Sequence, residues 1–173
     1  MTINKKINKK TRRNFIHHAS GAMGVVAVAS AGWPLIDQMN PSKDVEALSK
    51  VEIDLSNIIE GKSKTVMWRG KPLFIKHRTA EEIEDAKKVN IDILPDPQTD
   101  EERVKNPKYL VLIGVCTHLG CVPASDKGEY KGWFCPCHGS HYDTSGRIRK
   151  GPAPTNLEIP PYKFTNDNTI LVG

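Results

Sequence analysis

The sequence predicts a mainly β protein: an antiparallel β-sheet domain with a small inserted subdomain, one short helix and an N-terminal transmembrane helix. Three observations support this prediction. Short runs rich in β-branched and aromatic residues alternate with turn residues from residue 51 onward. A stretch of 23 residues without a formal charge, residues 14–36, precedes these runs. All four cysteines lie between residues 116 and 137, which indicates one local site and not a disulfide scaffold.

The excess positive charge of the chain belongs to its N-terminal segment. The formal net charge is +5, from 25 basic and 20 acidic residues among 173. Residues 1–14 hold six basic residues and no acidic one; the six are Lys5, Lys6, Lys9, Lys10, Arg12 and Arg13. Without them, 19 basic residues face 20 acidic residues, so the remainder is close to neutral. A nucleic-acid-binding face therefore has no support in the composition.

The N-terminal segment has the features of an exported, membrane-anchored protein. Residues 11–16, Thr-Arg-Arg-Asn-Phe-Ile, resemble a twin-arginine export signal. Residues 15–36 carry no formal charge and, at ~1.5 Å per helical residue, can span roughly 30 Å of hydrocarbon. We therefore expect a basic cytoplasmic segment over residues 1–14 and a transmembrane anchor over residues 15–36. Ala27-Val28-Ala29 and Ala29-Ser30-Ala31 resemble signal-peptidase sites, so removal of the helix after export is an alternative.

A polar linker and then a soluble domain follow the apolar stretch. Residues 37–50 contain Met39-Asn40-Pro41-Ser42 and show no strong strand pattern, so they are expected to bridge the anchor and a domain over residues 51–173. The β-forming runs of that domain define its expected strands. They lie at residues 51–55, 65–68, 73–76, 109–115, 130–134, 148, 157–159, 162–164 and 169–172, with hairpin turns at 69–72 and 166–168.

Between these strands the sequence predicts one helix and one long loop. Thr79 and Glu82 have the spacing of a capping box, in which each residue bonds to the backbone of the other. A helical stripe of apolar residues follows, so a short helix is expected over residues 80–89. Residues 92–106 are polar and contain two prolines, and they are expected to form a loop with a turn near Thr99.

The strand at residues 109–115 has the strongest signal, because its apolar residues are continuous. A strand that is apolar on both faces belongs in the core of a sheet protein. This strand ends one residue before Cys116, so it is expected to hold the first of two cysteine–histidine motifs rigidly. The run at residues 130–134 has the same relation to Cys135 in the second motif.

The two cysteine–histidine motifs form the candidate site. The first is Cys116-x-His118, and after sixteen residues the second is Cys135-x-x-His138. Two thiolates and two imidazoles on paired loops suit zinc or an iron–sulfur cluster. The other two cysteines each lie beside a candidate ligand. They leave open a zinc site with four cysteines, made of Cys116, Cys121, Cys135 and Cys137, besides one with two cysteines and two histidines.

The arrangement resembles the Rieske family, in which two cysteines hold one iron of a [2Fe–2S] cluster and two histidines hold the other. The resemblance includes the flanks Leu119-Gly120 and Gly139-Ser140, which neither zinc site explains, and continues to Pro154. It implies a Rieske-type domain whose cluster-binding subdomain covers about residues 112–155. The implied cluster ligands are Cys116, His118, Cys135 and His138, and the implied disulfide joins Cys121 and Cys137.

The resemblance also implies roles for residues around the cluster. Ser140 and Tyr142 occupy positions where high-potential members of the family place hydroxyl groups that hydrogen-bond the cluster sulfurs. His138, as a ligand together with His118, would accept a hydrogen bond and later a proton from quinol. Two imidazoles in place of two thiolates raise the reduction potential to a range of roughly −150 to +300 mV.

Further residues complete the expected site. Gly151-Pro152-Ala153-Pro154 resembles a proline loop that covers the cluster from a third side. Leu119 is expected to be an exposed apolar contact at the tip of the first motif. The remaining histidines have no ligand spacing and are expected to be surface or packing residues; they are His17, His18, His77 and His141.

The quinol-oxidising branch of the family is the most similar, because that branch joins the two additional cysteines as a disulfide. It implies an electron-transfer subunit of a bacterial inner-membrane quinol–cytochrome c reductase, with the soluble domain in the periplasm. The implied partners are ubiquinol, cytochrome b and a membrane-bound c-type cytochrome, and residues 39–42 would be a hinge. The alternatives are a Rieske ferredoxin and the Rieske subunit of an exported oxidase such as arsenite oxidase. Residues 39–42 and 70–75 resemble the quinol-oxidising subunits and favour that branch.

Overall fold

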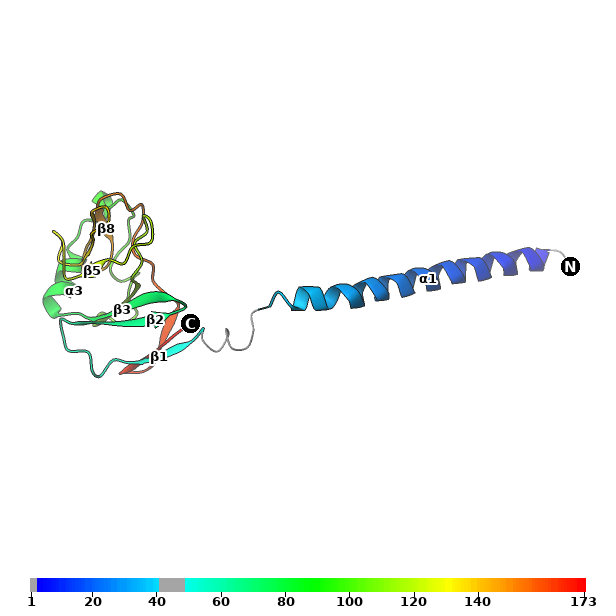
Figure 1. Cartoon of the computed structure of the whole chain (residues 1–173), viewed down its shortest axis with the longest axis horizontal. Helices are drawn as coiled ribbons and strands as arrows, with labels where there is room; N and C mark the ends of the chain where they lie inside the picture. The colour runs from blue at the N-terminus through cyan, green and yellow to red at the C-terminus, as the bar shows by residue number, and fades with distance from the viewer. Residues whose placement is uncertain (1–2, 41–48) are drawn as a thin grey trace. The chain divides into compact units, whose positions relative to one another are not determined.

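The computed structural model describes residues 3–40 and 49–173, with the side chains of the N-terminal part from residue 11 onward. The chain divides into two units, Met1–Glu46 and Ala47–Gly173 (Figure 1). Most of the linker expected over residues 37–50 lies outside the described residues. The hinge expected at residues 39–42 therefore stays a prediction.

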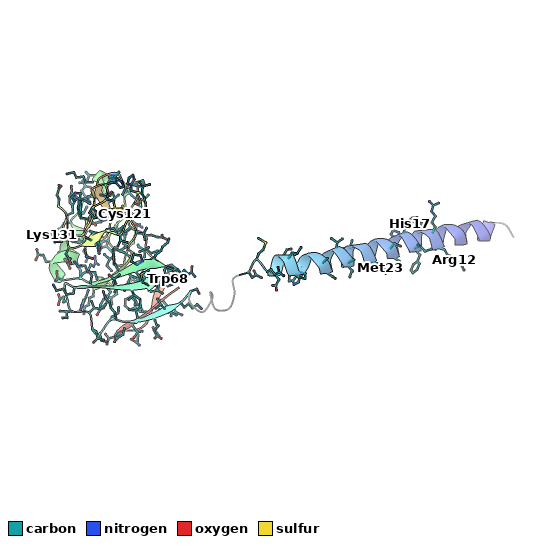
Figure 2. All side chains as sticks on the ribbon, in the orientation of Figure 1. Arg12, His17, Met23, Trp68, Cys121 and Lys131 are labelled. Atoms are coloured by element: carbon teal, nitrogen blue, oxygen red, sulfur yellow. A yellow bond between two sulfur atoms is a disulfide. The ribbon has the colours of Figure 1, made fainter. Side chains whose placement is uncertain are left out.

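In the described residues of the first unit, the chain forms the helix α1 over Ile3–Asp37 (Figure 2). Its part over Thr11–Asp37 is long and apolar enough to cross a membrane, and none of the apolar window is buried. At ~1.5 Å per residue, these 27 residues measure about 40 Å, which exceeds a hydrocarbon core of roughly 30 Å. The helix begins well before residue 15, so basic residues expected to precede the anchor form its first turns. A proline in the interior of a helix removes a backbone hydrogen bond and kinks or breaks the helix. Pro34 lies in the last turn of α1, close to the point where the helix ends.

The second unit contains three antiparallel β-sheets, as the sequence predicts for this domain (Figure 1). The first sheet has the order β1–β10–β9 and the second has the order β2–β3–β4. The third sheet, β5–β6–β7–β8, is the small inserted subdomain. The strands are β1 Val51–Asp54, β2 Ser63–Trp68, β3 Lys71–His77, β4 Tyr109–Ile113, β5 Ala124–Ser125, β6 Trp133–Cys135, β7 Ser140–Tyr142, β8 Ile148–Lys150, β9 Tyr162–Asn166 and β10 Thr169–Val172.

Both predicted hairpin turns are confirmed. Trp68 pairs with Lys71 across the turn between β2 and β3. The two residues between them, Arg69 and Gly70, have φ values of 48° and 73°, which a two-residue turn between twisted strands requires. The turn between β9 and β10 is closed by a side chain, because Asn168 N donates to the Oδ1 atom of residue 166 at 2.9 Å.

The predicted strands next to the two motifs have wrong bounds, and one predicted strand does not form. The strand expected over 109–115 ends at Ile113, because Val115 N donates back to Ile113 O at 2.8 Å and turns the chain. The strand expected over 130–134 begins only at Trp133, because Lys131 has φ 57° and interrupts the extended backbone. Residues 157–159 form no strand, because their backbone makes one hydrogen bond with Gly146 and one with Ile113. These two partners lie in different segments, so no ladder to a single strand forms.

The predicted helix is confirmed as α3, over Ala80–Lys87, and it ends two residues before the expected end at 89. The capping box is present: Glu82 N donates to Thr79 Oγ1 at 3.2 Å, and Thr79 N donates to Glu82 Oε2 at 2.9 Å. A short 3₁₀ helix, η1, over Ile91–Ile93, was not predicted, because three residues give no periodic signal. The turn expected near Thr99 is present, with Thr99 Oγ1 accepting a backbone hydrogen bond at 3.2 Å.

Strand β4 separates two hydrophobic clusters, because all five of its residues are buried. Its odd-numbered residues belong to a cluster shared with β1, β3 and β10. Its even-numbered residues, Leu110 and Leu112, belong to the cluster that includes the inserted subdomain. The other buried members of this second cluster are Phe74, Cys116, Trp133, Cys135, Tyr142, Ile148, Ala153 and Leu157. The candidate site is therefore built directly onto the core.

Candidate metal centre

The first loop of the site leaves β4 and folds back on itself. Cys116 N donates to Cys121 O at 2.8 Å, and Gly120 N donates to Cys116 O at 2.9 Å. Gly120 has φ 83°, a conformation that glycine adopts without the strain of a side chain. Cys116 is consequently held inward and is 2% exposed, whereas Leu119 at the loop tip is 70% exposed. The predicted exposure of Leu119 is confirmed.

The second loop joins β6 to β7 and is closed in a similar way. Gly139 N donates to Cys135 O at 3.0 Å, with Gly139 at φ 78°. Cys135 pairs with Ser140 across the two strands, so the residues between them project from the end of the hairpin. Cys135 is buried in the core, and His138 in the projecting part is exposed.

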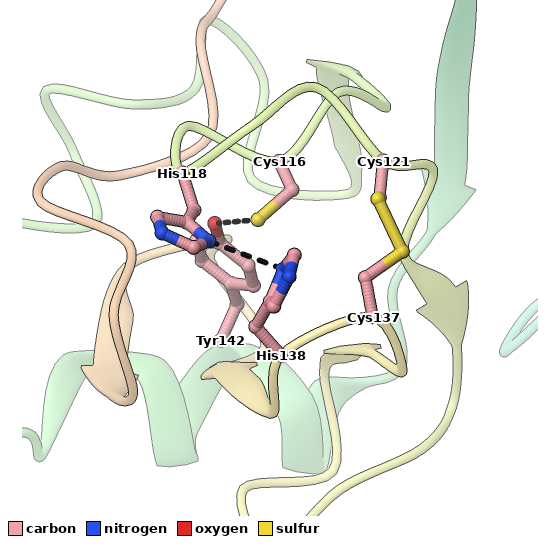
Figure 3. Close-up of a disulfide and its surroundings, with 6 residues drawn as sticks. All are labelled: Cys116, His118, Cys121, Cys137, His138 and Tyr142. Carbon is pink, nitrogen blue, oxygen red and sulfur yellow. Dashed lines mark hydrogen bonds between the residues drawn. A yellow bond between two sulfur atoms is a disulfide. The ribbon is translucent and has the colours of Figure 1, made fainter.

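The two loops bring their histidines together. His118 Nδ1 and His138 Nδ1 lie 3.2 Å apart, and the planes of the two rings cross at 87°. Figure 3 shows both imidazoles turned toward one another, with the sulfur of Cys116 beside them. Cys116 and Cys135 are free thiols, and both are buried. The donor set of two thiols and two imidazole nitrogens fits a Rieske-type [2Fe–2S] cluster.

Cys121 and Cys137 form a disulfide that joins the two loops (Figure 3). Their Cα atoms lie 6.7 Å apart, and 16 positions separate them in the sequence. The sulfurs of Cys121, Cys135 and Cys137 lie within 4.8 Å of one another, a spacing that three thiolates could use to hold a metal ion. A disulfide sulfur is no thiolate, however, and the thiolate is the metal ligand. With this disulfide formed, a zinc site with four cysteines is excluded.

Tyr142 places its hydroxyl against the sulfur of Cys116. The two atoms lie 3.2 Å apart, and Tyr142 Oη is also 3.4 Å from both N and Oγ1 of Thr117. Burial raises the pKa of the Tyr142 phenol above its usual value, and the neighbouring Cys116 raises this pKa further. The phenol therefore stays protonated at neutral pH and can act as a hydrogen-bond donor.

The two free thiols have different environments. Burial acts to raise the pKa of the Cys116 thiol, but hydrogen bonds from Tyr142 and from the backbone of His118 outweigh burial and lower this pKa. Burial raises the pKa of the Cys135 thiol, and the neighbouring Cys116 raises it further. The surroundings of Cys116 thus already favour negative charge on sulfur, which metal binding requires.

The predicted proline loop packs on the second ligand loop. Ser140 is 1% exposed, and its Oγ accepts a hydrogen bond from Ala153 N at 3.2 Å. Gly151 has φ 110°, and a Cβ at this position would lie 2.6 Å from both Gly139 O and Ser140 Cα. The close approach of the two backbones therefore requires glycine at position 151.

Buried charged residues support the site, and the sequence patterns missed them. Asp143 accepts from Arg147 Nε at 2.9 Å, and Asp100 accepts from Arg78 Nη1 at 2.6 Å. Arg103 is 2% exposed and donates to backbone carbonyls of the adjoining segments. These residues lie in loops, in turns or just beyond a strand end, where no periodic pattern marks a buried position. The separation of Asp143 and Arg147 by four residues is a weak signal that could have found one pair.

The histidines outside the two motifs lie in packing or surface positions, in agreement with the prediction. The ring of His77 stacks on Tyr109, with centroids 4.6 Å apart. His141 Nδ1 accepts from Glu129 N at 3.1 Å. His17 and His18 are exposed on α1.

Two protein families match the chain. The family described as Ubiquitinol-cytochrome C reductase Fe-S subunit TAT signal matches residues 4–42, and the Rieske [2Fe-2S] domain matches residues 53–162. The ubiquinol-cytochrome c reductase iron-sulfur subunit of Rhodospirillum rubrum is 55% identical over 170 residues, covering 95% of this chain and 93% of that protein. The subunit of the same name from Rickettsia prowazekii is 56% identical over 174 residues, covering 99% and 98%. A chain of the solved Hyperthermophilic respiratory Complex III is 32% identical, with a TM-score of 0.54 and coverage of 90% and 98%.

These matches decide between the interpretations that the sequence leaves open. They agree with the quinol-oxidising branch and not with a Rieske ferredoxin or an exported oxidase. The matched signal over residues 4–42 and the apolar helix α1 fit a membrane-anchored bacterial subunit. The cofactor of the matched domain is a [2Fe–2S] cluster, which the paired thiols and imidazoles fit. The chain belongs to the family of Rieske iron–sulfur subunits of ubiquinol–cytochrome c reductase.

Proposed function

We propose that Cys116 and Cys135 bind one iron of the [2Fe–2S] cluster, and that His118 and His138 bind the other through Nδ1. The observation that carries this assignment is the convergence of donors from two loops. The two Nδ1 atoms lie 3.2 Å apart, and both thiols are free and buried. The disulfide between the other two cysteines holds the loops together and removes those sulfurs from the ligand set.

Two hydroxyl groups tune the site in this proposal. When bound, the cluster supplies a one-electron carrier with a potential of roughly −150 to +300 mV. Tyr142 donates a hydrogen bond to the sulfur of Cys116, and Ser140 would donate one to a sulfur of the bound cluster. Ser140 Oγ accepts from Ala153 N, which leaves its own proton available for donation. Hydrogen bonds to a more negative acceptor are stronger, so both residues favour the reduced form and raise the potential.

His138 is the residue that contacts quinol in this proposal. With Nδ1 turned inward, its Nε2 is the nitrogen left for an external partner, and the side chain is exposed. In a neutral imidazole bound through Nδ1, Nε2 carries the ring proton; once that proton is lost, Nε2 would accept a hydrogen bond from a quinol hydroxyl and then its proton. His118, half-buried beside it, offers a second nitrogen of the same kind. Proton acceptance at His138 accompanies the transfer of one electron.

The proposed reaction is the one-electron oxidation of ubiquinol within a ubiquinol–cytochrome c reductase, the complex that the relatives are named after. Ubiquinol and cytochrome b are the partners on the donor side, where the second electron of ubiquinol would go to a haem of cytochrome b. A membrane-bound c-type cytochrome is the partner that receives the electron. Leu119, exposed at the tip of the first loop, supplies an apolar contact for these partners.

The proposal places the chain in the bacterial inner membrane. Residues 1–14 stay in the cytoplasm, because their six basic residues follow the positive-inside rule, and residues 15–36 remain as the anchor. Residues 37–50 are the linker and hinge. Residues 51–173 lie in the periplasm, an oxidising compartment where the disulfide persists, and about residues 112–155 form the cluster-binding subdomain.

Electron paramagnetic resonance of the dithionite-reduced full chain tests the site, with iron and acid-labile sulfide assayed on the same sample. A rhombic signal whose mean g value lies below that of all-cysteine clusters, with two irons and two sulfides, is expected. A silent spectrum in a sample that contains zinc and no sulfide would refute the proposal. His138→Ala should abolish the signal, whereas the matched variant His141→Ala, three residues away, should keep it.

A further inference from the structure

The segment over residues 153–157 contacts both ligand loops. Ala153 N donates to Ser140 Oγ of the second loop at 3.2 Å. Thr155 O accepts from Thr117 Oγ1 of the first loop at 2.7 Å. Pro154 and Thr155 are exposed, so this stretch buries little apolar surface between its two contacts. Its position must therefore be fixed by the residues that follow.

Asn156 fixes the segment directly after Thr155. This residue is 6% exposed, and its side chain uses both of its polar atoms. Its Oδ1 accepts from Ile148 N at 2.9 Å, and its Nδ2 donates to Asp96 O at 3.1 Å and to Gln98 Oε1 at 3.3 Å. Its backbone N donates to Asp96 Oδ2 at 2.9 Å. Asn156 thus ties the segment to β8 and to the loop that precedes β4.

Arg103 fixes the next residue from the same loop. Its Nη2 donates to Leu157 O at 2.6 Å, its Nε donates to Ser145 O at 2.7 Å, and its Nη1 donates to Gln98 Oε1 at 2.5 Å. The guanidinium group is planar and presents its donors in a fixed fork. One rigid group therefore sets the distance between residue 157 and the turn after Tyr142.

The anchored segment reaches the site through Thr117, which lies between Cys116 and His118. Thr117 N donates to Tyr142 Oη at 3.4 Å, so this oxygen acts as the acceptor of that bond. Its single proton is left for Cys116 Sγ, at 3.2 Å. Thr117 Oγ1 directs its own proton to Thr155 O, so toward Tyr142 Oη it can only accept, and at 3.4 Å it lies further from this oxygen than Cys116 Sγ does. Thr155 therefore holds Thr117 in place, and Thr117 in turn orients the Tyr142 hydroxyl.

We propose that Arg103 and Asn156 are positioning residues for electron transfer, which keep Ala153 and Thr155 within hydrogen-bond distance of Ser140 and Thr117. Neither residue touches the ligand atoms, and both act through the hydroxyl groups of Ser140 and Tyr142. This inference rests on the proposed function, because it assigns the effect of the two residues to hydrogen bonds toward the cluster sulfurs.

The test is a redox titration, followed by electron paramagnetic resonance, of the cluster-loaded full chain in detergent. Asn156→Leu removes the amide at similar volume and unchanged charge, and Arg103→Lys keeps the charge but loses the fork. Both variants are expected to shift the midpoint potential downward. The shift caused by Asn156→Leu should shrink in a Ser140→Ala/Tyr142→Phe background, because the groups through which it acts are then absent.

A stability control separates positioning from general destabilisation. Ile170 is fully buried in β10 of the first sheet, and Ile170→Ala should lower the melting temperature without moving the potential. The proposal is overturned if Arg103→Lys and Asn156→Leu lower the melting temperature and leave the potential where it is in the parent. Should Asn156→Leu not hold the cluster, Arg103→Lys supplies the same measurement. Failure of the proposed function itself would appear separately, as a missing signal in the parent protein.

Discussion

Replacing Tyr142 with Phe removes one hydroxyl group from the site. The variant loses a hydroxyl but keeps a ring that is fully buried, so the packing of the second cluster is retained. The variant loses the 3.2 Å contact with the sulfur of Cys116 and the two longer contacts with Thr117, and only the first of these reaches a proposed ligand atom. A hydrogen bond to a charged group contributes about 1.5–3 kcal/mol and a neutral one about 1 kcal/mol, so reduction strengthens the bond by about 1 kcal/mol. Since ~59 mV corresponds to a tenfold change for one electron, the potential should fall by about 40 mV.

The assay is a redox titration of the cluster-loaded protein, and Tyr162→Phe is the matched control. Tyr162 is also a buried tyrosine, but its hydroxyl accepts from Lys105 N at 3.1 Å and does not face the ligands. Its loss should lower stability without moving the potential. Because the pKa of Tyr142 is raised by burial, the difference between parent and Tyr142→Phe should not vary between about pH 6 and 8. An unchanged potential in Tyr142→Phe would refute the reasoning.

Three other perturbations test separate parts of the structure. Cys137→Ser opens the disulfide to Cys121 and should lower the free energy of unfolding by about 3 kcal/mol, visible in thermal melting; an unaltered melting temperature would contradict this. Asp100→Asn unpairs the buried Arg78 and should cost about 3 kcal/mol at neutral pH. Burial acts to raise the pKa of Asp100, but its hydrogen bonds from Arg78 and Ser145 outweigh burial and lower this pKa below 3.8. The ionised carboxylate therefore stabilises the fold above pH 3.8, and this stabilisation is lost as the pH falls through the lowered pKa. Urea unfolding should therefore show the difference in stability between parent and Asp100→Asn narrowing as the pH is lowered below 3.8, and a constant difference would argue against the pair. Leu119→Ala should slow quinol oxidation in the assembled complex and leave the melting temperature and the potential unchanged, and an equal rate would remove Leu119 from the docking contact.

The two loops that carry the proposed ligands could be located from the sequence, because their residue types and spacing are characteristic. In each motif a cysteine and a histidine lie two or three positions apart, and sixteen residues separate the two motifs. This pattern can be read directly from the sequence. The strand that leads to Cys116 was predictable for a related reason, since a strand buried on both faces must be continuously apolar. The capping box at Thr79 needs only two residues three positions apart, and the structure confirms both of its hydrogen bonds.

The remainder depends on contacts between segments far apart in the chain. Leu157 belongs to an apolar run that looks like a strand, yet its backbone bonds to Gly146 and its carbonyl accepts from Arg103, so no ladder forms. Strand β7 at Ser140–Tyr142 is too short to produce an alternating pattern. Asn156 has the composition of an ordinary loop residue, and only the fold shows that it is buried and fully bonded. Sequence patterns therefore locate the proposed ligands better than they locate the residues that hold those ligands in place.

The spacing within each motif lets one loop meet two opposite requirements. Electron transfer is favoured by a site whose geometry does not change, and the cysteines satisfy this because both are 2% exposed within the core. Proton transfer needs a nitrogen that a partner can reach, and the histidines lie two or three residues further along, where His118 is half-buried and His138 is exposed. Each loop turns back immediately afterwards, at Gly120 or Gly139, so its histidine cannot move far from its cysteine. In the proposed assignment, the cysteine and histidine ligands thus differ in burial as well as in chemistry, and the exposed histidine side of the site is the side where the proposal places quinol.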